Sequence, residues 1–161
     1  MNIREATEDD WPSFFPIFSA IIAAGETYAY SANLTSDDAR SLWMESPPSR
    51  VIVAVDEGRI VGSAKMGPNR PGRGAHVATA SFMVDPNSHG RGIGRALGVD
   101  VIARARDEGY VAIQFNAVVE TNVGAVHLWQ GLGFEILATI PEAFDSAKHG
   151  LVGLHVMYLK L

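Results

Sequence analysis

Hydrophobic positions in the first half of the 161-residue chain alternate between helix-like and strand-like spacing. A capping box at 7–10 predicts a helix that ends near Gly25, and Pro16 predicts a kink or a delayed start because proline lacks an amide donor. A shorter helix is predicted from a Ser36-Asp37-Asp38 cap to the residues before Pro47. Runs rich in β-branched residues predict strands at 50–56 and 59–66, which we expect to form an antiparallel hairpin, and residues 2–5 predict a short edge strand.

The second half predicts a βαβ unit. A loop rich in glycine and proline at 67–74 precedes a predicted strand at 76–84, and apolar residues at spacing four from Ile93 to Ala105 predict a helix. The nearly continuous apolar run at 110–119 is typical of a strand covered on both faces, and we expect it to pair in parallel with strand 76–84. A helix at 122–130 and strands at 134–140 and 151–159 complete a single predicted domain over 1–161.

Composition narrows the function classes. Only 19% of the residues are charged and the formal net charge is -5, so we expect no nucleic-acid partner and no anionic membrane surface. The absence of cysteine excludes disulfides, thiolate metal sites and a cysteine nucleophile, and it fits a cytoplasmic protein. The apolar stretch at 14–24 is too short for a membrane span, and the first residues lack the pattern of a secretion signal.

A glycine turn between the predicted strand 76–84 and the following helix is the first candidate site. Gly90, Gly92 and Gly94 leave backbone N–H groups uncovered where the helix begins, and that geometry favours a phosphate. The turn fits neither the P-loop pattern nor the dinucleotide-binding fingerprint, whose glycines are spaced differently. Alternatively, the glycines only permit a tight connection.

Two motifs resemble the GCN5-related N-acetyltransferases (GNAT family). The segment 82–97, with His89-Gly90-Arg91-Gly92-Ile93-Gly94, is similar to the acetyl-CoA-binding segment of that family, and 122–134 is similar to its Asn, Ala, Leu, aromatic, Gly-Phe helix and strand start. The resemblance covers nearly the whole chain. It implies an α/β fold with a mixed, largely antiparallel sheet of about seven strands, a central splayed parallel pair and helices on both faces.

The resemblance also implies a cofactor site. Backbone amides of the glycine turn would bind the pyrophosphate, the splayed strand would pair with the pantetheine arm, and a backbone amide near Val84 would polarise the thioester carbonyl. Asn122 would bond the pantetheine arm or a water, or would serve only as a helix cap. The cofactor-side residues implied are Phe82, Met83, Val84, His89, Gly90, Arg91, Gly92, Ile93, Gly94, Arg95, Ala96, Asn122 and Trp129.

The sequence departs from the family pattern at two positions. His89 stands where Gln or Arg is usual, and Trp129 stands where many members carry a Tyr thought to protonate the departing thiolate. An indole N–H is not a practical acid, so water or the attacking ammonium would supply that proton. We interpret Trp129 as a packing wall beside the thioester. The alternative is a catalytically silent acyl-CoA sensor.

The acceptor side resembles the GNAT subgroup that acetylates azetidine-2-carboxylate and other proline analogues in yeast, through the segments 25–30, 67–69 and 114–116. An amine needs a base or water relay to lose its proton, and the candidates for this role are Glu26, His76 and Asn116. Of these, we predict Asn116 and Glu26 as catalytic residues. Glu26 is alternatively a solvated loop carboxylate. The predicted substrate-binding residues are Glu26, Tyr28, Tyr30, His76, Thr79 and Asn116.

These observations predict an acetyl-CoA-dependent N-acetyltransferase that acts on a small amine, such as an amino acid or analogue, by direct transfer in a ternary complex. No cysteine is present to carry an acyl intermediate. Acetyl-CoA is the expected co-substrate, no metal is expected, and homodimer formation is left open. A third possibility is an enzyme that acetylates protein amines, which would need an acidic groove near Glu26 and Glu142.

Overall fold

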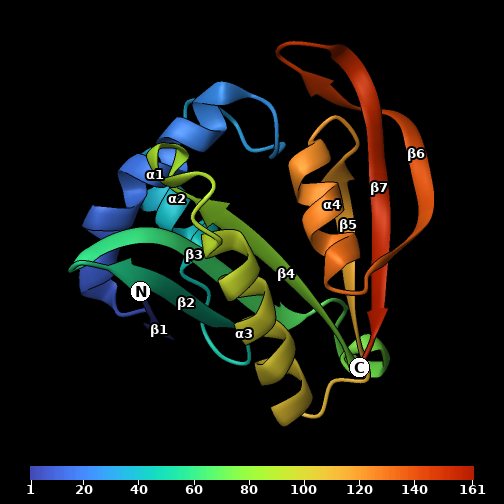
Figure 1. Ribbon diagram of the computed structural model, residues 1–161, viewed down its shortest axis with the longest axis horizontal. Helices are drawn as coiled ribbons and strands as arrows, with labels where there is room; N and C mark the ends of the chain where they lie inside the picture. The colour runs from blue at the N-terminus through green and yellow to red at the C-terminus, as the bar shows by residue number, and fades with distance from the viewer.

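One mixed sheet of seven strands runs through the molecule in the order β1-β2-β3-β4-β5-β7-β6 (Figure 1). A computed structural model describes residues 1–161. Every neighbouring pair is antiparallel except β4 with β5, which run in parallel. The strands are β1 Asn2–Glu5, β2 Arg50–Asp56, β3 Arg59–Pro68, β4 Val77–Val84, β5 Ala112–Val119, β6 Glu135–Ser146 and β7 Gly150–Lys160.

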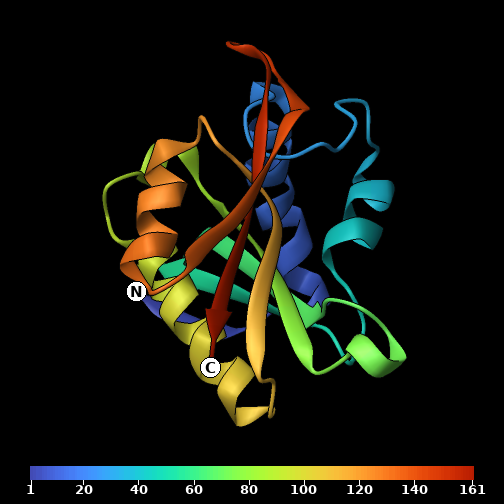
Figure 2. The same cartoon turned by 90° about the vertical axis from the view of Figure 1, so that its right-hand side faces the viewer.

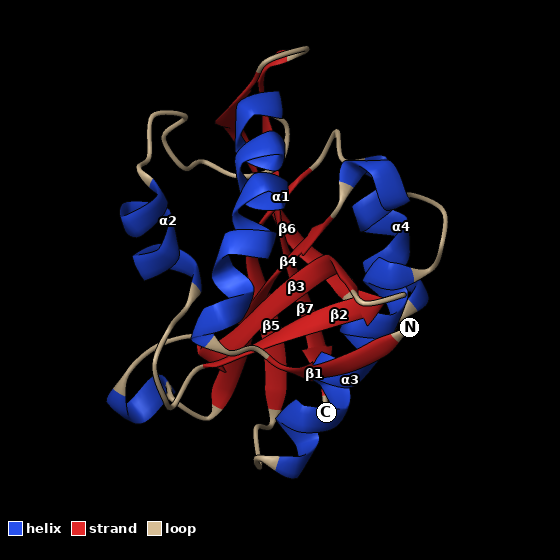
Figure 3. Ribbon diagram, turned by 90° about the vertical axis from the view of Figure 1, so that its left-hand side faces the viewer, coloured by secondary structure: helices blue, strands red, loops and turns tan.

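Helices cover both faces of this sheet (Figure 3). The helices are α1 Trp11–Ala24, α2 Ser36–Trp43, α3 Ile93–Asp107 and α4 Val123–Gly131, with short 3-10 turns at Glu8–Asp10, Pro86–Ser88 and Gly72–Gly74. One apolar core lies between the sheet and α3 and α4, and a second lies under α1 and α2. No helix is long and apolar enough to cross a membrane.

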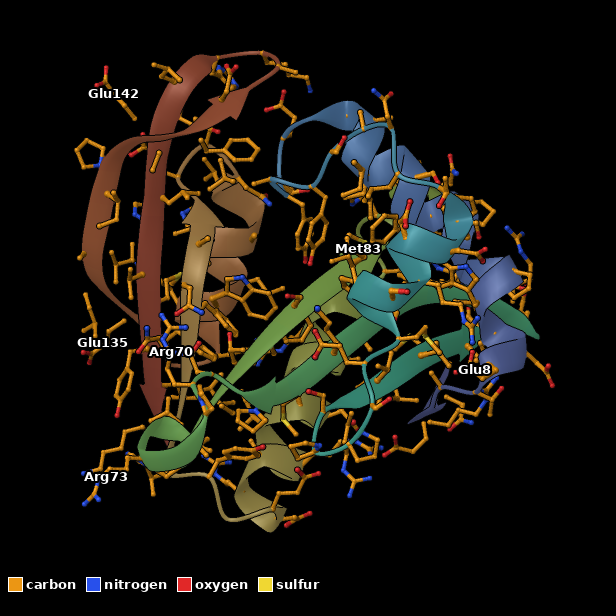
Figure 4. All side chains as sticks on the ribbon, turned by 180° about the vertical axis from the view of Figure 1, so that it is seen from behind. Glu8, Arg70, Arg73, Met83, Glu135 and Glu142 are labelled. Atoms are coloured by element: carbon orange, nitrogen blue, oxygen red, sulfur yellow. The ribbon has the colours of Figure 1, made fainter.

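Alternation along β4 sends its side chains into both cores. Phe82 and Val84 pack against the core under α3, whereas Met83 is 1% exposed and belongs to the core under α1 and α2. In Figure 4, Met83 lies close to α1 and α2, while Glu142 lies far away on the β6–β7 hairpin. Strand β4 therefore contributes side chains to both apolar cores.

Strands β4 and β5 are paired only at one end. Their register contains Val77 opposite Ala112 and Ala78 opposite Ile113, and no further pair. Beyond Ala78 the strands diverge, and α4 accompanies β5 on its side of the gap (Figure 1). The predicted splayed parallel pair is confirmed, as is the α/β fold with its largely antiparallel sheet.

Several element boundaries differ from the sequence predictions, among them those of α2, α1 and β6. The cap of α2 is Thr35, whose hydroxyl accepts from the N–H of Asp38 at 3.2 Å, so the predicted Ser36 cap was wrong by one residue. Helix α1 starts at Trp11, directly after a 3-10 turn, and contains Pro16 in its interior, so Pro16 does not delay its start as predicted. The β6–β7 hairpin reaches Ser146 and projects beyond the rest of the sheet (Figure 2), six residues past the predicted end at 140.

Candidate active site

The edge of β4 that faces β5 offers backbone hydrogen-bonding groups. The N–H of Asp85 donates to the carbonyl of Val61 at 2.9 Å, which fixes the phase of the antiparallel β3–β4 ladder. Because backbone groups alternate in direction along a strand, the peptide groups of Val84, Phe82 and Ala80 face the gap instead. An extended ligand with amide groups can pair with this edge.

The glycine turn ends where α3 begins. Gly90 and Gly92 have φ angles of 77° and 75°, which favour glycine, and a Cβ at either position would meet no atom within 4 Å. No side chain caps the helix, and its first internal hydrogen bond runs from the N–H of Ala96 to Gly92. The preceding N–H groups of residues 93–95 have no backbone partner, so they can donate to an anion.

The charged side chains around this turn differ in how available they are to an anion. Arg91 forms an ion pair with Asp56, whose carboxylate also holds the N-terminal amine at 3.2 Å. The N-terminal amine, followed by the nearby Arg91, holds the pKa of Asp56 below its usual range. Arg95 and His89 are exposed, and neither side chain makes a hydrogen bond or ion pair within the chain. A phosphate at this turn would meet main-chain donors first and Arg95 next.

Trp129 is 7% exposed and forms the wall of the gap beside β4. Its ring centroid lies 4.5 Å from that of Phe82 and 5.0 Å from that of Phe115. A Cβ at Gly98 of α3 would approach the indole to 3.1 Å, so the helix presses closely on the ring. The indole nitrogen of Trp129 has no hydrogen-bond partner in the chain. It is not fully buried, because Thr27 Oγ1 is the only fully buried polar side-chain atom without a partner, so it keeps some contact with solvent.

A chain of amides lines the opposite face of the sheet. Gln114 Nε2 donates to Asn116 Oδ1 at 2.8 Å, and Asn116 Nδ2 donates to Asn69 Oδ1 at 2.6 Å. Asn116 is exposed beside a bulge in β5, so it meets solvent and has two protein partners. The sequence analysis predicted no role for Asn69 or Gln114. The one feature of the sequence that could have indicated them is that both fall in segments typical of the azetidine-2-carboxylate subgroup.

The loop after α1 reaches the open end of the gap. The Tyr28 hydroxyl contacts the backbone of Phe82, and the Tyr28 ring stacks on Tyr30 with centroids 5.6 Å apart. Tyr30 also stacks on Phe18 at 5.9 Å, which anchors the loop to α1. Tyr28 therefore lies at the gap, while the Tyr30 ring packs between its two aromatic neighbours.

Glu26 joins this loop to the β6–β7 hairpin and is poorly placed as a base. Its carboxylate accepts from Ser146 Oγ at 2.7 Å and from the N–H of Lys148 at 2.9 Å. The Ser146 hydrogen bond is the main reason that the pKa of Glu26 lies below its usual range. A carboxylate with both oxygens occupied and a lowered pKa is a weak proton acceptor. The geometry favours a structural role for Glu26, and its catalytic role stays a prediction.

The remaining predicted residues are spread around the gap. Asn122 Oδ1 accepts from the N–H of Ala125 at 3.3 Å, so Asn122 does cap α4. Thr79 is half-buried on β4, one residue beyond the last β4–β5 pair. His76 is exposed just before β4, and its side chain makes no hydrogen bond. Of the predicted acceptor side chains, Tyr28, Thr79 and Asn116 are those on or beside the two splayed strands.

A splayed parallel pair next to an uncapped glycine turn can hold an acyl-CoA, because it offers main-chain donors for a diphosphate and a strand edge for an extended amide-containing arm. The sequence matches the model of the acetyltransferase (GNAT) family over residues 4–134, and the chain belongs to that family. It is therefore an acetyl-CoA-dependent acetyltransferase.

Similar proteins support the same class. A GCN5-related N-acetyltransferase structure from Kribbella flavida is 58% identical, with a TM-score of 0.96 over 99% of this chain and 97% of that chain. The structure of yncA from Salmonella typhimurium with its cofactor acetyl-CoA is 25% identical, with a TM-score of 0.84 over 100% and 94%. The L-amino acid N-acyltransferase MnaT from Escherichia coli is 29% identical over 88% of this chain and 84% of its own length.

Proposed function

We propose that this acetyltransferase transfers the acetyl group of acetyl-CoA directly to the amine of a small molecule, namely an amino acid or an analogue of one. The observation that carries this proposal is the two-sided gap between β4 and β5. One face holds the glycine turn and Trp129, and the other carries the amide chain of Asn116. A cofactor and an acceptor can meet across the splay without an intermediate on the protein.

The proposed binding of acetyl-CoA rests on main-chain groups of α3 and β4 that already face the gap or the glycine turn. The diphosphate would bind the first N–H groups of α3, and the pantetheine amides would pair with the edge of β4 that faces the gap. A Cβ at Gly94 would lie 3.8 Å from Val84 Cγ2, so the turn and the end of β4 are adjacent. Acetyl-CoA supplies an activated thioester, and the protein orients it and stabilises its carbonyl oxygen.

The acceptor half rests on the polar groups of the opposite face. The Asn116 amide can donate to a carboxylate through its NH₂ group or accept from an amine through its oxygen. The similarity to an L-amino acid N-acyltransferase favours an acceptor that has both groups. The 25–30, 67–69 and 114–116 segments extend this proposal to azetidine-2-carboxylate and other proline analogues.

The decisive experiment is a screen of amine acceptors scored by release of CoA thiol from acetyl-CoA. The panel should contain amino acids, proline analogues, polyamines and basic peptides. Turnover of amino acids or proline analogues supports the proposal, whereas turnover of peptides alone supports the protein-amine alternative. Acetyl-CoA binding without turnover of any amine supports the silent sensor. Cell fractionation and light scattering would test the expected cytoplasmic location and the open homodimer question.

Gly92→Glu tests the cofactor site separately by calorimetry. A carboxylate against the diphosphate should abolish acetyl-CoA binding because two anions would share one site. Gly92→Ala is the matched control, since it carries the same strain at a φ angle of 75° without the charge. Unchanged affinity in a folded Gly92→Glu protein would remove the diphosphate from this turn.

A further inference from the structure

The Tyr28 hydroxyl makes both hydrogen bonds that a neighbouring strand would make to Phe82. Tyr28 Oη donates to the carbonyl oxygen of Phe82 at 2.6 Å and accepts from the N–H of Phe82 at 2.9 Å. This contact lies four residues beyond Ala78, where the pairing of β4 with β5 ends. A phenol oxygen therefore stands where a ligand carbonyl would accept from β4.

Packing holds the Tyr28 ring in this position. The ring stacks on Tyr30 and meets Trp43 edge to face, with centroids 6.3 Å apart. The same loop is bound to the β6–β7 hairpin, because Gly25 O accepts from the N–H of Ala147 at 3.0 Å. Burial raises the pKa of Tyr28, so its hydroxyl keeps its proton at neutral pH and can donate.

The level of Phe82 along β4 fits the reacting end of the cofactor. The glycine turn adjoins Val84, which is the first residue whose peptide faces the gap. The next such peptide is that of Phe82, about 7 Å further along the strand. An extended arm that starts at the turn passes Val84 first and brings its acyl end toward Phe82. The Trp129 ring, 4.5 Å from the Phe82 ring, lies at the same level.

We propose that the Tyr28 hydroxyl is a catalytic hydrogen-bond donor of the acetyl transfer. When the thioester carbonyl oxygen takes the N–H of Phe82, the displaced hydroxyl turns its O–H from the Phe82 carbonyl to that same oxygen. This inference rests on the proposed function, in which the edge of β4 binds acetyl-CoA. Phe82 N–H and Tyr28 O–H then form an oxyanion site with two donors. This site lies two residues before Val84 on β4, whereas the sequence predicted an amide near Val84.

The chemical step balances without proton transfer from Tyr28. The amine nitrogen forms a bond to the carbonyl carbon, and the π-electron pair moves onto the oxygen held by the two donors. Collapse of this intermediate restores the C=O bond and breaks the C–S bond, so the thiolate leaves with the electron pair. The proton lost by the amine goes to water or to the thiolate. Tyr28 remains protonated and only stabilises the oxyanion.

Tyr28→Phe removes the donor and keeps the ring. Loss of one oxyanion donor should lower kcat by about 100-fold or more, with a smaller change in the KM for acetyl-CoA. Tyr110→Phe is the matched control, because Tyr110 lies between α3 and β5 at the closed end of the sheet and its hydroxyl makes no hydrogen bond. This control should keep its activity. A Tyr28→Phe protein with kcat within two-fold of the wild type would overturn the proposal.

Infrared spectroscopy separates a catalytic hydroxyl from a merely structural one. The probe is isotopically labelled acetyl-CoA bound without acceptor, and its carbonyl stretch should rise in frequency in Tyr28→Phe because one donor is lost. CoA, which has no carbonyl at this position, should bind both proteins equally. A reduced kcat with an unshifted stretch would mean that Tyr28 only supports the loop, and the proposal would be wrong. A wild-type protein that binds no acetyl-CoA would instead refute the proposed function on which this inference rests.

Discussion

At the scale of single residues, the site combines unusual side chains with ordinary backbone chemistry. The donors that fit acetyl-CoA are main-chain N–H groups of α3 and β4, which do not depend on side-chain identity. Replacement of the usual Gln or Arg by His89 therefore leaves these donors in place. Replacement of the usual Tyr by Trp129 changes more, since it removes a hydroxyl from the side of the gap where the thiolate would leave.

Trp129 should act through its shape. Trp129→Phe keeps an aromatic ring against Phe82 and should retain most of the turnover. Trp129→Ala opens a hole between Phe82, Phe115 and Gly98, and it should lose turnover and about 3 to 5 kcal/mol of unfolding free energy. Steady-state kinetics and urea denaturation of both variants test this prediction. Equal loss of turnover in two folded variants would instead indicate an essential indole N–H.

Asn116 should determine acceptor efficiency without affecting the cofactor. Asn116→Leu keeps the approximate volume, removes the bonds to Asn69 and Gln114, and would also remove the proposed bond to an acceptor. A hydrogen bond to a charged group contributes roughly 1.5 to 3 kcal/mol, so kcat/KM for the acceptor should fall by about ten-fold to a hundred-fold or more. Acetyl-CoA affinity, measured by calorimetry, should stay nearly constant. A variant that weakens only acetyl-CoA binding would contradict the assignment.

At the scale of secondary-structure elements, local patterns predicted most of the fold. The β2–β3 hairpin, the βαβ unit and the cap at Asn122 all follow from short-range signals, namely turn residues, apolar spacing and a capping side chain. The extension of β6 past 140 was missed because Pro141 and Glu142 read as the end of a strand. Glu142 has a φ angle of 52°, so the chain bends there and then resumes pairing.

The candidate site was only partly predictable for a physical reason. The glycine turn is a contiguous segment, so the hypothesis that it binds a phosphate could be drawn from neighbouring residues in the sequence. The Tyr28–Phe82 contact joins residues 54 positions apart, and the Glu26–Ser146 contact joins residues 120 apart. No periodicity or motif specifies such a pair. Glu26 therefore looked like a free loop carboxylate until the hairpin was placed beside it.

Glu26 should behave as a clamp between the α1–α2 loop and the β6–β7 hairpin. Glu26→Gln weakens the bond to Ser146 but keeps an oxygen for the N–H of Lys148, so turnover should fall by no more than a few-fold. The pH profile of kcat/KM should keep its shape, because the lowered pKa of Glu26 makes it a weak base.

Ser146→Ala is the matched variant, since it breaks the same contact and leaves the carboxylate intact. Both variants should show the same small kinetic change if the clamp is the whole role of Glu26. A large loss of kcat in Glu26→Gln alone, with normal acetyl-CoA binding, would restore the catalytic role.

At the scale of the whole molecule, the splay divides the sheet into two arms. The arm with β1 to β4 carries α1, α2 and α3, and the arm with β5 to β7 carries α4 (Figure 1). The loop after α1 connects these arms at the open end, through Phe82 of β4 on one side and the β6–β7 hairpin on the other. One loop therefore links the gap-facing edge of β4 to the β6–β7 hairpin.

Overall stability should depend on an ion pair between Arg4 of β1 and Asp10, the residue before α1. Arg4 donates to both oxygens of Asp10, at 2.7 and 2.8 Å, and the side chain of Asp10 is only 11% exposed. The hydrogen bond from Arg4 is the main cause that lowers the pKa of Asp10 to about 2. A carboxyl group with a lower pKa in the folded state than in the unfolded state stabilises the fold above the unfolded pKa of about 3.9.

This stabilisation, on the order of 2 kcal/mol, should be lost as the pH falls from about 4 toward 2. Asp10→Asn removes the charge, so it should lower the unfolding free energy by about 1 to 2 kcal/mol at pH 7, and the difference from wild type should shrink over that acidic range. Urea denaturation across pH measures both effects. Asp9→Asn is the matched control, because Asp9 is exposed, forms no ion pair and should leave the curve unchanged. A deficit in Asp10→Asn that stays constant down to pH 2 would show that packing, and not the charge of Asp10, stabilises this corner.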